Sequence, residues 1–546
     1  MKQHNGYLPA MQVGSQVTKG QWIVYIDQEV TVGHGWLEGI VLGIASSPRV
    51  ALVSPWTNKE IPIIEGTGFD HFSKVFFESS DGESRTAAFP SRNCFAVKRS
   101  VLEEMGGWDV EYYSPGYGEL ADFYMRAMNA KWLSLKAPGS YIFDDSKGKS
   151  NIGNWLENKG AGFERFLVRW GTHPLKAFRR DGERAKIKLV ARRFLKLFDQ
   201  KESVKVIFLF RDFELCGAML AATHLCNGLN ERGYNATIAF CRNAPGHNSN
   251  MLPAKFAPLQ KATRQELAKE IGENRGKVFL IATTSIVAPE VASIALGKDN
   301  IEPIYFVQDD ESRFEHGTGE KYFKEGHVEN TYGMIERKIS NSVWVQELLK
   351  EKGFESTRIP IGVDTNMFRP LERQAEKVRI MAHCRPSTTR RGWPFIQAIV
   401  NQAAREVDFE FIAFDQEYEV NEMAMAIHAN LGQLKPHELA REMGAVDIFF
   451  EGSVFQGFGM QALEAMSCGC ALLSTKNLGV NDYGVDGLNS VLVKYGDIKG
   501  AVKQLVAMGK NKKRRKELGE EARKTALRFD WEIICDQWAE YLQGVK

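Results

Sequence analysis

The chain contains no apolar run that approaches the ~18 residues of a membrane-spanning helix. Its first residues, Met1 to Tyr7, include no hydrophobic segment, so we expect no signal peptide. The eight cysteines lack paired spacing, which argues against a disulfide framework or a zinc site. The net formal charge is only +2, and the basic residues are not interleaved with strand aromatics, which argues against nucleic-acid binding. These absences predict a cytoplasmic protein with reduced cysteines.

The chain does contain enough apolar material for several buried cores. It has 546 residues, of which 44% are hydrophobic. A length of about 150 residues per domain predicts three or four structural units. Apolar strands alternate with amphipathic helices throughout, which predicts the α/β class. We predict a first unit at residues 1–173, a basic helical linker at 174–202, and two further α/β domains at 203–370 and 371–546.

The linker carries an apolar stripe surrounded by lysines and arginines. Its apolar residues at helical spacing are Ile187, Val190, Phe194, Leu197 and Phe198. One interpretation is a helix that lies on an anionic membrane surface, which would place the protein at the inner membrane. The other is a helix between domains whose stripe packs on a neighbouring domain.

A glycine turn directly before an amphipathic helix is the most informative feature of the second half. The segment Glu451–Glu464 reads E-G-S-V-F-Q-G-F-G-M-Q-A-L-E. Glycines at positions 457 and 459 allow a ligand to approach the backbone, and the start of a helix offers free N–H groups to an anion. With Glu464 on the first turns of the helix, the site suits a sugar attached to a diphosphate. The alternative is a glycine turn that simply caps a helix.

This segment closely resembles the donor site of family-4 glycosyltransferases, which have the GT-B fold and the pattern E-G-F-G-x-x-x-L-E-A-M-A-x-G-x-P. Gln456 stands where the pattern has its first Glu, and Glu464 is the second. The resemblance continues in the strand and glycine loop around Gly217, the segment Ile361–Pro370, the turn at Gly432 and the tail Arg528–Trp531. It implies a GT-B fold of two Rossmann-like domains, the first on the acceptor side and the second binding a nucleotide-sugar.

The resemblance also implies residue roles. Arg385 and Arg391 match the positions at which the family binds the donor diphosphate with an Arg and a Lys. Fixed cations there stabilise the charge that builds on the leaving phosphate, and Arg binds phosphate bidentately. Glu464 would hold the ribose hydroxyls and Gln456 the donor sugar, with retention of configuration and no metal cofactor in this half. Donor-binding roles are implied for Gly217, Gly432, Gly457, Phe458 and Gly459.

A run of polar residues follows the strand that contains Tyr305. Together with later segments, Gln308, Asp309 and Asp310 resemble the rhamnan-type subgroup of the family, which makes bacterial surface polysaccharides. Loops at the carboxyl ends of parallel strands hold ligands in α/β proteins, so these residues are predicted to line the acceptor cleft. A solvated acidic turn is the alternative. The implied partners are a nucleotide-sugar donor and a glycan or lipid-linked oligosaccharide acceptor.

The first half contains a second group of carboxylates. Ile23–Val30 is predicted as a buried strand that ends in Asp27 and Glu29, whose side chains would share one face and bind a divalent cation. The pattern resembles the D-x-D motif of family-2 glycosyltransferases with the GT-A fold, which implies Mn²⁺ or Mg²⁺. Leu120 replaces the usual general base, which leaves Glu119 and Asp122 as acid/base candidates. Because the chain begins just before this strand, we expect a partial GT-A-like module that is inactive, with residual activity or a partner that supplies strands as the alternatives.

These patterns together predict a glycosyltransferase that moves a sugar from a nucleotide-sugar donor to a growing surface polysaccharide or glycan. The alternative from another class is a non-catalytic scaffold that keeps the fold and binds nucleotides or glycans. Gln456 is the residue that raises this alternative, since it lacks the charge of the family's Glu.

Overall fold

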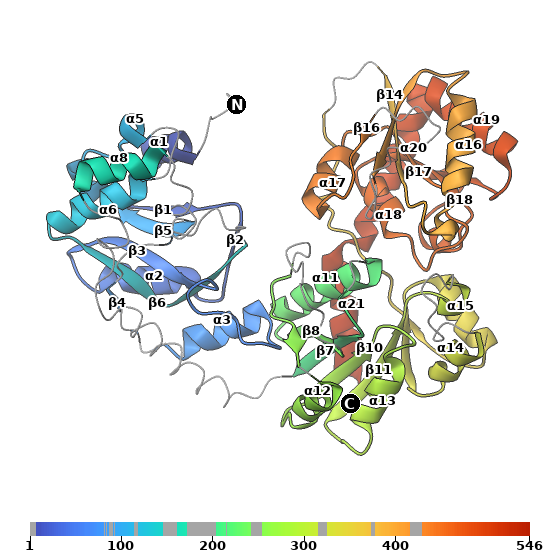
Figure 1. The fold of residues 1–546 in the computed structure, drawn as a ribbon, viewed down its shortest axis with the longest axis horizontal. Helices are drawn as coiled ribbons and strands as arrows, with labels where there is room; N and C mark the ends of the chain where they lie inside the picture. Colours follow the sequence, from blue (N-terminus) through green and yellow to red (C-terminus); the bar gives the residue numbers. More distant parts are fainter. Residues whose placement is uncertain are drawn as a thin grey trace. The chain divides into compact units, whose positions relative to one another are not determined.

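A computed structural model describes residues 7–80, 82, 85–86, 91, 93–113, 118–145, 161–171, 204–213, 216–241, 254–261, 263–314, 325–372, 377–414 and 429–545. The predicted linker at 174–202 lies outside these residues. The chain divides into two compact units, Met1–Ser203 and the residues from Val204 onward, apart from the short segments Gly233–Asn235 and Lys255–Ala257, which group with the first (Figure 1). Among the described helices, none is both long and apolar enough to cross a membrane.

The first unit is built on a mixed six-stranded sheet with the order β1-β5-β3-β6-β2, in which β4 also pairs with β6. Only the β3–β6 pairing is parallel among the pairings described. All eight residues of β3 are buried, because helices cover the centre of the sheet. The strands are β1 (Trp22–Ile26), β2 (Val30–Val32), β3 (Val50–Thr57), β4 (Arg85–Thr86), β5 (Cys94–Lys98) and β6 (Leu133–Asp144). The helices are α1 (Tyr7–Val17), α2 (Trp36–Ala45), α3 (Phe69–Glu78), α4 (Arg99–Glu104), α5 (Val110–Tyr113), α6 (Glu119–Asn129) and α8 (Ala161–Trp170).

The prediction that the strand at Ile23–Val30 is buried is wrong. Strand β1 ends at Ile26 and lies at the edge of the described sheet, where it pairs with β5 alone. Ile23 is buried, whereas Val24 and Ile26 are 37% and 47% exposed. The cause is position in the sheet, because side chains on the uncovered face of an edge strand alternate toward solvent.

The second unit confirms the α/β class with two sheets in the doubly wound order. The first sheet runs β13-β12-β11-β10-β7-β8-β9, and the second runs β16-β15-β14-β17-β18-β19. In both, the strand order reverses beside the first strand, between β7 and β10 and between β14 and β17. Ligands of such sheets bind at the carboxyl ends of the strands on either side of this reversal.

The first sheet of this unit contains β7 (Lys205–Phe210), β8 (Asn235–Phe240), β9 (Leu259–Gln260), β10 (Val278–Ala282), β11 (Ile301–Val307), β12 (Arg337–Ser340) and β13 (Thr357–Arg358). Its helices are α11 (Gly217–Glu231), α12 (Arg264–Gly272), α13 (Ala288–Ala295), η2 (Glu311–Arg313), α14 (Glu325–Tyr332) and α15 (Val343–Glu351). Strand β7 is apolar along its length because it is a central parallel strand that is buried on both faces.

The second sheet contains β14 (Val378–His383), β15 (Phe409–Phe414), β16 (Ala429–Asn430), β17 (Ile448–Glu451), β18 (Ala471–Thr475) and β19 (Ser490–Val493). Its helices are η4 (Thr389–Arg391), α16 (Trp393–Ala403), α17 (Pro436–Met443), α18 (Met460–Ser467), η5 (Gly479–Asp482), α19 (Ile498–Lys510), α20 (Lys512–Ala526) and η6 (Leu527–Phe529). Figure 1 shows α16 and α19 together on one side of this sheet.

The last helix, α21 (Trp531–Gly544), packs on the first sheet of the unit and not on the second. Trp538 is fully buried, and its ring centroid lies 5.6 Å from that of Phe208 in β7 and 5.1 Å from that of Phe306 in β11. The prediction of one domain over residues 371–546 therefore differs from the structure at its end. The order of elements in the sequence did not reveal that the chain returns to the first sheet of this unit after the second sheet is complete.

Candidate functional site

The glycine turn lies at the carboxyl end of β17, beside the reversal of strand order in the second sheet. Gly459 has a φ of 91° and precedes the first residue of α18. A Cβ atom on Gly217, at the start of α11, would lie 3.7 Å from the sulfur of Met460. The first turns of α11 and α18 therefore approach one another from the two sheets, with their free N–H groups at adjacent ends.

Both glycines of the turn are packed against atoms of the protein itself. A Cβ atom on Gly457 would lie 1.9 Å from the carbonyl oxygen of Gln308, and one on Gly459 would lie 2.7 Å from the hydroxyl of Tyr483. The sequence predicted that glycines here leave room for a ligand. The structure gives a different reason for glycine at both positions. Glycine is needed here because another part of the chain already occupies the space.

Contacts at Gly457 join the loops of the two sheets. The N–H of Gly457 donates to Oδ2 of Asp309 at 3.0 Å. The indole N–H of Trp344 donates to the carbonyl oxygens of Gln456 and Gly457, at 2.9 and 2.8 Å. The turn is thus held from the first sheet of the second unit as well as from its own sheet.

Glu464 is a half-buried carboxylate on the second turn of α18. Burial raises its pKa to about 7, and no charged group or hydrogen bond among the described residues offsets that effect. A carboxylate without a partner in such a place is an acceptor for hydroxyl groups of a ligand. This agrees with the ribose-binding role that the resemblance implies, which stays a prediction.

The raised pKa predicts that donor binding improves as pH rises through 7. Only the ionised form of Glu464 accepts hydrogen bonds at both oxygens, so below pH 7 the KM for a nucleotide-sugar should rise by up to about tenfold per pH unit. Steady-state kinetics between pH 5.5 and 8.5 measure this dependence. Glu464→Gln should remove it. If the dependence persists in that variant, the titrating group is instead Glu311, whose pKa burial also raises to about 7.

Three arginines follow β14 and gather near the glycine turn. Gly392 fixes the loop, because its φ is 67° and a Cβ atom there would lie 2.0 Å from the carbonyl oxygen of Gly452. The carbonyl oxygen of Arg390 accepts the N–H of Val454 at 2.8 Å. The predicted Arg385 and Arg391 therefore belong to a loop that is tied to the segment just before the turn, together with Arg390.

The arginines impose a strong positive potential on their surroundings. Burial, and then the positive charge of Arg391, lower the pKa of Arg390 to about 10. Burial, Arg391 and Arg385 hold the pKa of His383 well below its ordinary value, so the imidazole is neutral. The Nε atom of Arg391 is buried and has no partner among the described residues. Crowded cations with unused donors are what a phosphate site requires.

Arg390 and His383 were not among the predicted site residues. The sequence did signal Arg390, since two adjacent arginines stand where the family pattern uses a single cation. His383 ends an apolar strand and carried no signal of its own. Its Nε2 atom is buried without a hydrogen-bond partner among the described residues.

Other predicted residues of the second half have structural roles. Phe458 is 2% exposed and packs with Tyr483 and Phe529, so its side chain belongs to the core. Gln456 is buried, and its side-chain N–H donates to the hydroxyl of Ser453 at 3.1 Å. Its side chain is therefore already oriented by the loop.

The three predicted acceptor-side residues separate into different environments. Asp310 caps η2, where it accepts the N–H of Ser312 at 3.2 Å and pairs with Arg313 at 3.0 Å, so it is a local cap. The side-chain nitrogen of Gln308 is buried without a partner among the described residues. Asp309 contacts the glycine turn. Gly432 has a φ of 57° in an open turn after β16.

Glu311 is a further buried carboxylate that the sequence did not single out. Both of its oxygens accept the N–H of Ser285 at 3.0 Å, and one accepts the Ser285 hydroxyl at 2.5 Å. Burial nevertheless raises its pKa to about 7. The sequence did contain a signal, because three acidic residues follow Gln308. The predicted acceptor-side set stopped at Asp310 and left out the third of them.

In the first unit, Asp27 and Glu29 lie on a turn and not on an extended strand. The N–H of Val30 donates to the carbonyl of Asp27 at 3.1 Å, and Oδ1 of Asp27 accepts the N–H of Glu29 at 3.0 Å. The argument that alternate residues of a strand share a face therefore does not apply to this pair. Within the part of the chain that the structure describes, no three His, Cys, Asp or Glu residues are placed to hold a metal ion. The cation at Asp27 and Glu29 stays a prediction.

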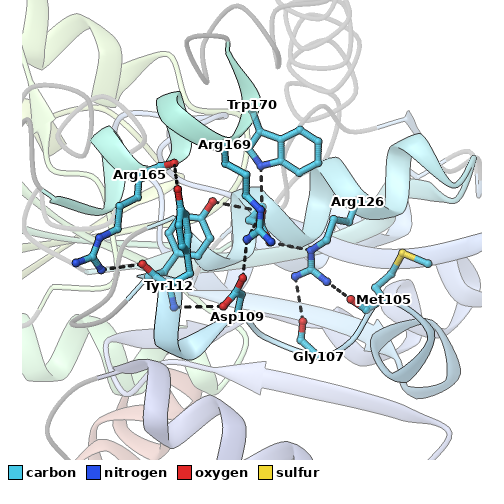
Figure 2. A network of polar contacts seen from close by, with 10 residues as sticks. Met105, Gly107, Asp109, Tyr112, Arg126, Arg165, Arg169 and Trp170 are labelled. Atoms are coloured by element: carbon cyan, nitrogen blue, oxygen red, sulfur yellow. Dashed lines mark hydrogen bonds and ion pairs between the residues drawn. The ribbon is translucent and has the colours of Figure 1, made fainter.

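Asp122 is held by donors that the sequence could not show. Figure 2 shows the polar network of this region, in which Arg126 donates to the carbonyl oxygens of Met105 and Gly107. Its carboxylate is 0% exposed and pairs with Arg126 at 2.7 Å and Arg169 at 3.3 Å. It also accepts from the hydroxyl of Tyr113 at 3.3 Å and the indole N–H of Trp170 at 3.0 Å. Asp122 thus ties α8 to α5 and α6, and its acid/base role stays a prediction. Glu119, the other candidate, is 1% exposed at the start of α6.

Comparison with known proteins identifies part of the second unit. Residues 416–525 match the family model described as Glycosyl transferases group 1. Part of the second unit is therefore similar to group 1 glycosyl transferases. An uncharacterized glycosyltransferase of Methanocaldococcus jannaschii is 28% identical over 102 residues, 19% of this chain and 29% of that protein. The MMP alpha-(1->4)-mannosyltransferase of Mycolicibacterium hassiacum is 22% identical over 242 residues, 40% of this chain and 58% of that protein. The chain therefore spans less than two thirds of the length of these relatives.

Solved structures share the fold of the second unit. Anabaena HepE in complex with UDP and glucose superposes with a TM-score of 0.52 at 16% identity, over 62% of this chain and 100% of that one. A variant of S. aureus TarM in complex with Fondaparinux, alpha-GlcNAc-glycerol and UDP gives 0.51 at 10% identity, over 62% and 99%. These likenesses support the GT-B arrangement of two doubly wound sheets.

Proposed function

We propose that the second unit transfers a sugar from a nucleotide-sugar donor to a glycan acceptor. One observation carries the proposal: three crowded arginines follow β14, and Glu464, which has no ion-pair partner in the part of the chain that the structure describes, follows β17. These two strands flank the reversal of order in the second sheet. Cations there stabilise the leaving diphosphate, and the carboxylate accepts two ribose hydroxyls. The match to group 1 glycosyl transferases supports this function, and the UDP in the HepE and TarM complexes supports UDP-sugars as the first donors to examine.

The proposed transfer retains configuration by front-face departure. Arg385 and Arg391 stabilise the diphosphate as the glycosidic bond breaks, and a phosphate oxygen takes the proton of the incoming hydroxyl. The arginines supply the positive charge, so we assign no step to a metal ion in this unit. Gln456, oriented by Ser453, is placed to contact the donor sugar by hydrogen bonds alone.

The acceptor in this proposal is a growing bacterial surface polysaccharide or a lipid-linked oligosaccharide, as in the rhamnan-type subgroup. The side-chain nitrogen of Gln308 supports an acceptor site after β11, because it is an unused donor at the carboxyl end of a parallel strand. A protein acting on lipid-linked acceptors would work in the cytoplasm at the inner membrane surface, where the basic segment 174–202 would contact anionic lipid.

For the first unit we propose a GT-A-like module that does not transfer sugar by itself. The support is that Asp122 is fully engaged by its four neighbours and that Leu120 stands at the position of the usual base. The competing function, a scaffold that binds nucleotides or glycans without catalysis, is favoured by the loss of a charged residue at Gln456.

The proposal is tested by the release of nucleoside diphosphate from a panel of UDP-, GDP- and dTDP-sugars, with and without Mn²⁺, with glycan acceptors present. We expect release from one donor without metal, at the same rate in wild type and Asp27→Ala, because the chemistry lies in the second unit. Release of nucleoside diphosphate that requires Mn²⁺ and is lost in Asp27→Ala would place the transfer reaction in the first unit instead. No release from any donor would favour the scaffold.

A further inference from the structure

Asp309 occupies the position at which the turn and the arginines would receive an anion. Its Oδ2 atom lies 3.0 Å from the nitrogen of Gly457 and 3.9 Å from Nη1 of Arg390. The two side chains are 13% and 19% exposed. A backbone N–H and a guanidinium that converge on one oxygen form the kind of cradle that binds phosphate.

Arg390 is fixed in place and cannot follow a ligand far. Its guanidinium lies over the rings of Phe314, 4.6 Å from the centroid, and Phe455, at 5.5 Å. Its backbone is held by Val454. Glu451, the other carboxylate that acts on Arg390, accepts the N–H of Ser453 at 2.9 Å and is likewise held. Removal of the Asp309 carboxylate would therefore make the guanidinium of Arg390 available to bind a phosphate.

The carboxylate of Asp309 is not strongly stabilised in this position. Burial raises its pKa, and the attraction of Arg390 and the N–H groups of Asp310 and Gly457 only partly offset that effect. The carboxylate of Asp309 carries a single negative charge and is attracted by both Arg390 and Arg391. A diphosphate carries at least two negative charges and satisfies these cations better than one carboxylate does.

We propose that Asp309 is an internal counter-ion for the arginine group, and that the phosphate of a nucleotide displaces it and takes Arg390 as a third phosphate-binding cation. This inference rests on the proposed function, since it concerns the same donor site. Displacement frees the N–H of Gly457 and breaks one of the contacts between the loops of the two sheets. Donor binding is thereby coupled to the release of the acceptor-side loop that begins at Gln308.

The test is the affinity for inorganic pyrophosphate and for UDP, measured by isothermal titration calorimetry on the full chain. Asp309→Asn keeps an oxygen for the N–H of Gly457 but removes the charge, so it should bind pyrophosphate about tenfold more tightly. Arg390→Ala should bind about tenfold more weakly, and adding it to Asp309→Asn should remove the gain. Thermal melts establish that each variant folds.

Asp482→Asn is the matched control. Asp482 is also a buried carboxylate between the loops of the two sheets, where it pairs with Arg358 at 3.0 Å and accepts the N–H of Val343, but it is not among the groups that act on Arg390. Its substitution should change pyrophosphate affinity less than twofold. Unchanged or weaker binding by Asp309→Asn, an equal gain in Asp482→Asn, or no pyrophosphate binding by any variant would overturn the inference. Tight pyrophosphate binding without cleavage of any donor would refute only the proposed function.

Discussion

Arg391→Ala is expected to lower the rate of donor cleavage by about 10²–10³-fold while leaving the fold intact. The guanidinium lies in a loop fixed by Gly392 and has a buried donor without a partner among the described residues, so it is free to bind the leaving diphosphate. Charge on the phosphate grows as the glycosidic bond breaks, and the loss should therefore fall mainly on kcat. Single-turnover release of nucleoside diphosphate measures it directly.

Two further variants make the result specific. Arg391→Lys keeps the charge but loses the planar fork, and should lose only about tenfold. Arg405→Ala removes an exposed arginine just beyond the end of α16 and should behave as wild type. If Arg391→Ala retains more than a third of the wild-type rate at an unchanged melting temperature, the guanidinium does not stabilise the transition state. The charge would then have to come from Arg385 and Arg390.

Asp122→Ala is expected to lower the free energy of unfolding of the first unit by about 3–5 kcal/mol, because Arg126 loses its buried carboxylate partner and Arg169 keeps only its ion pair with Asp109. Arg126 and Arg169 would face one another without the carboxylate, and Tyr113 and Trp170 would lose their acceptor. Urea-dependent hydrogen exchange of peptides from α5, α6 and α8 reports this loss separately from the second unit.

Asp122→Asn keeps the hydrogen-bond acceptor but not the charge, and should lose less than the alanine variant. Glu111→Ala removes an exposed carboxylate of α5 and should change the free energy of unfolding by less than about 0.5 kcal/mol. Donor cleavage by the second unit should be unaffected in all three. An Asp122→Ala protein with unaltered exchange but without metal-dependent transfer would show instead that Asp122 is a catalytic residue of the first unit.

The elements that the sequence predicted well are those set by local composition. The strands β7 and β14 are apolar along most of their length because both faces are covered, and this pattern is visible without any structure. The glycine turn before α18 was also predicted, and Gly459 there has the positive φ that a residue without a side chain adopts most readily. These features are determined by residues that are close together in the sequence, so a local pattern is enough to predict them.

The features that the sequence did not predict depend on distant partners. Gly457 is constrained by the carbonyl of Gln308, and no local pattern connects two residues so far apart in the chain. Asp122 and Arg126 are four residues apart on α6 and could be paired from the sequence, but Arg169 and Trp170 come from α8. The sequence therefore predicted an acid/base role for Asp122 but could not show that its carboxylate is buried among four donors.

The return of α21 to the first sheet of the second unit bears on how the protein is synthesised. Domains generally fold from the N-terminus as the chain leaves the ribosome. The rings of Phe208 and Phe306 cannot be covered by Trp538 until translation has passed residue 538. The sheet that begins at β7 therefore keeps part of its apolar face exposed to solvent while the residues of the second sheet are synthesised. A ribosome that stops before Trp531 therefore releases a chain in which α21 cannot cover the first sheet of the second unit.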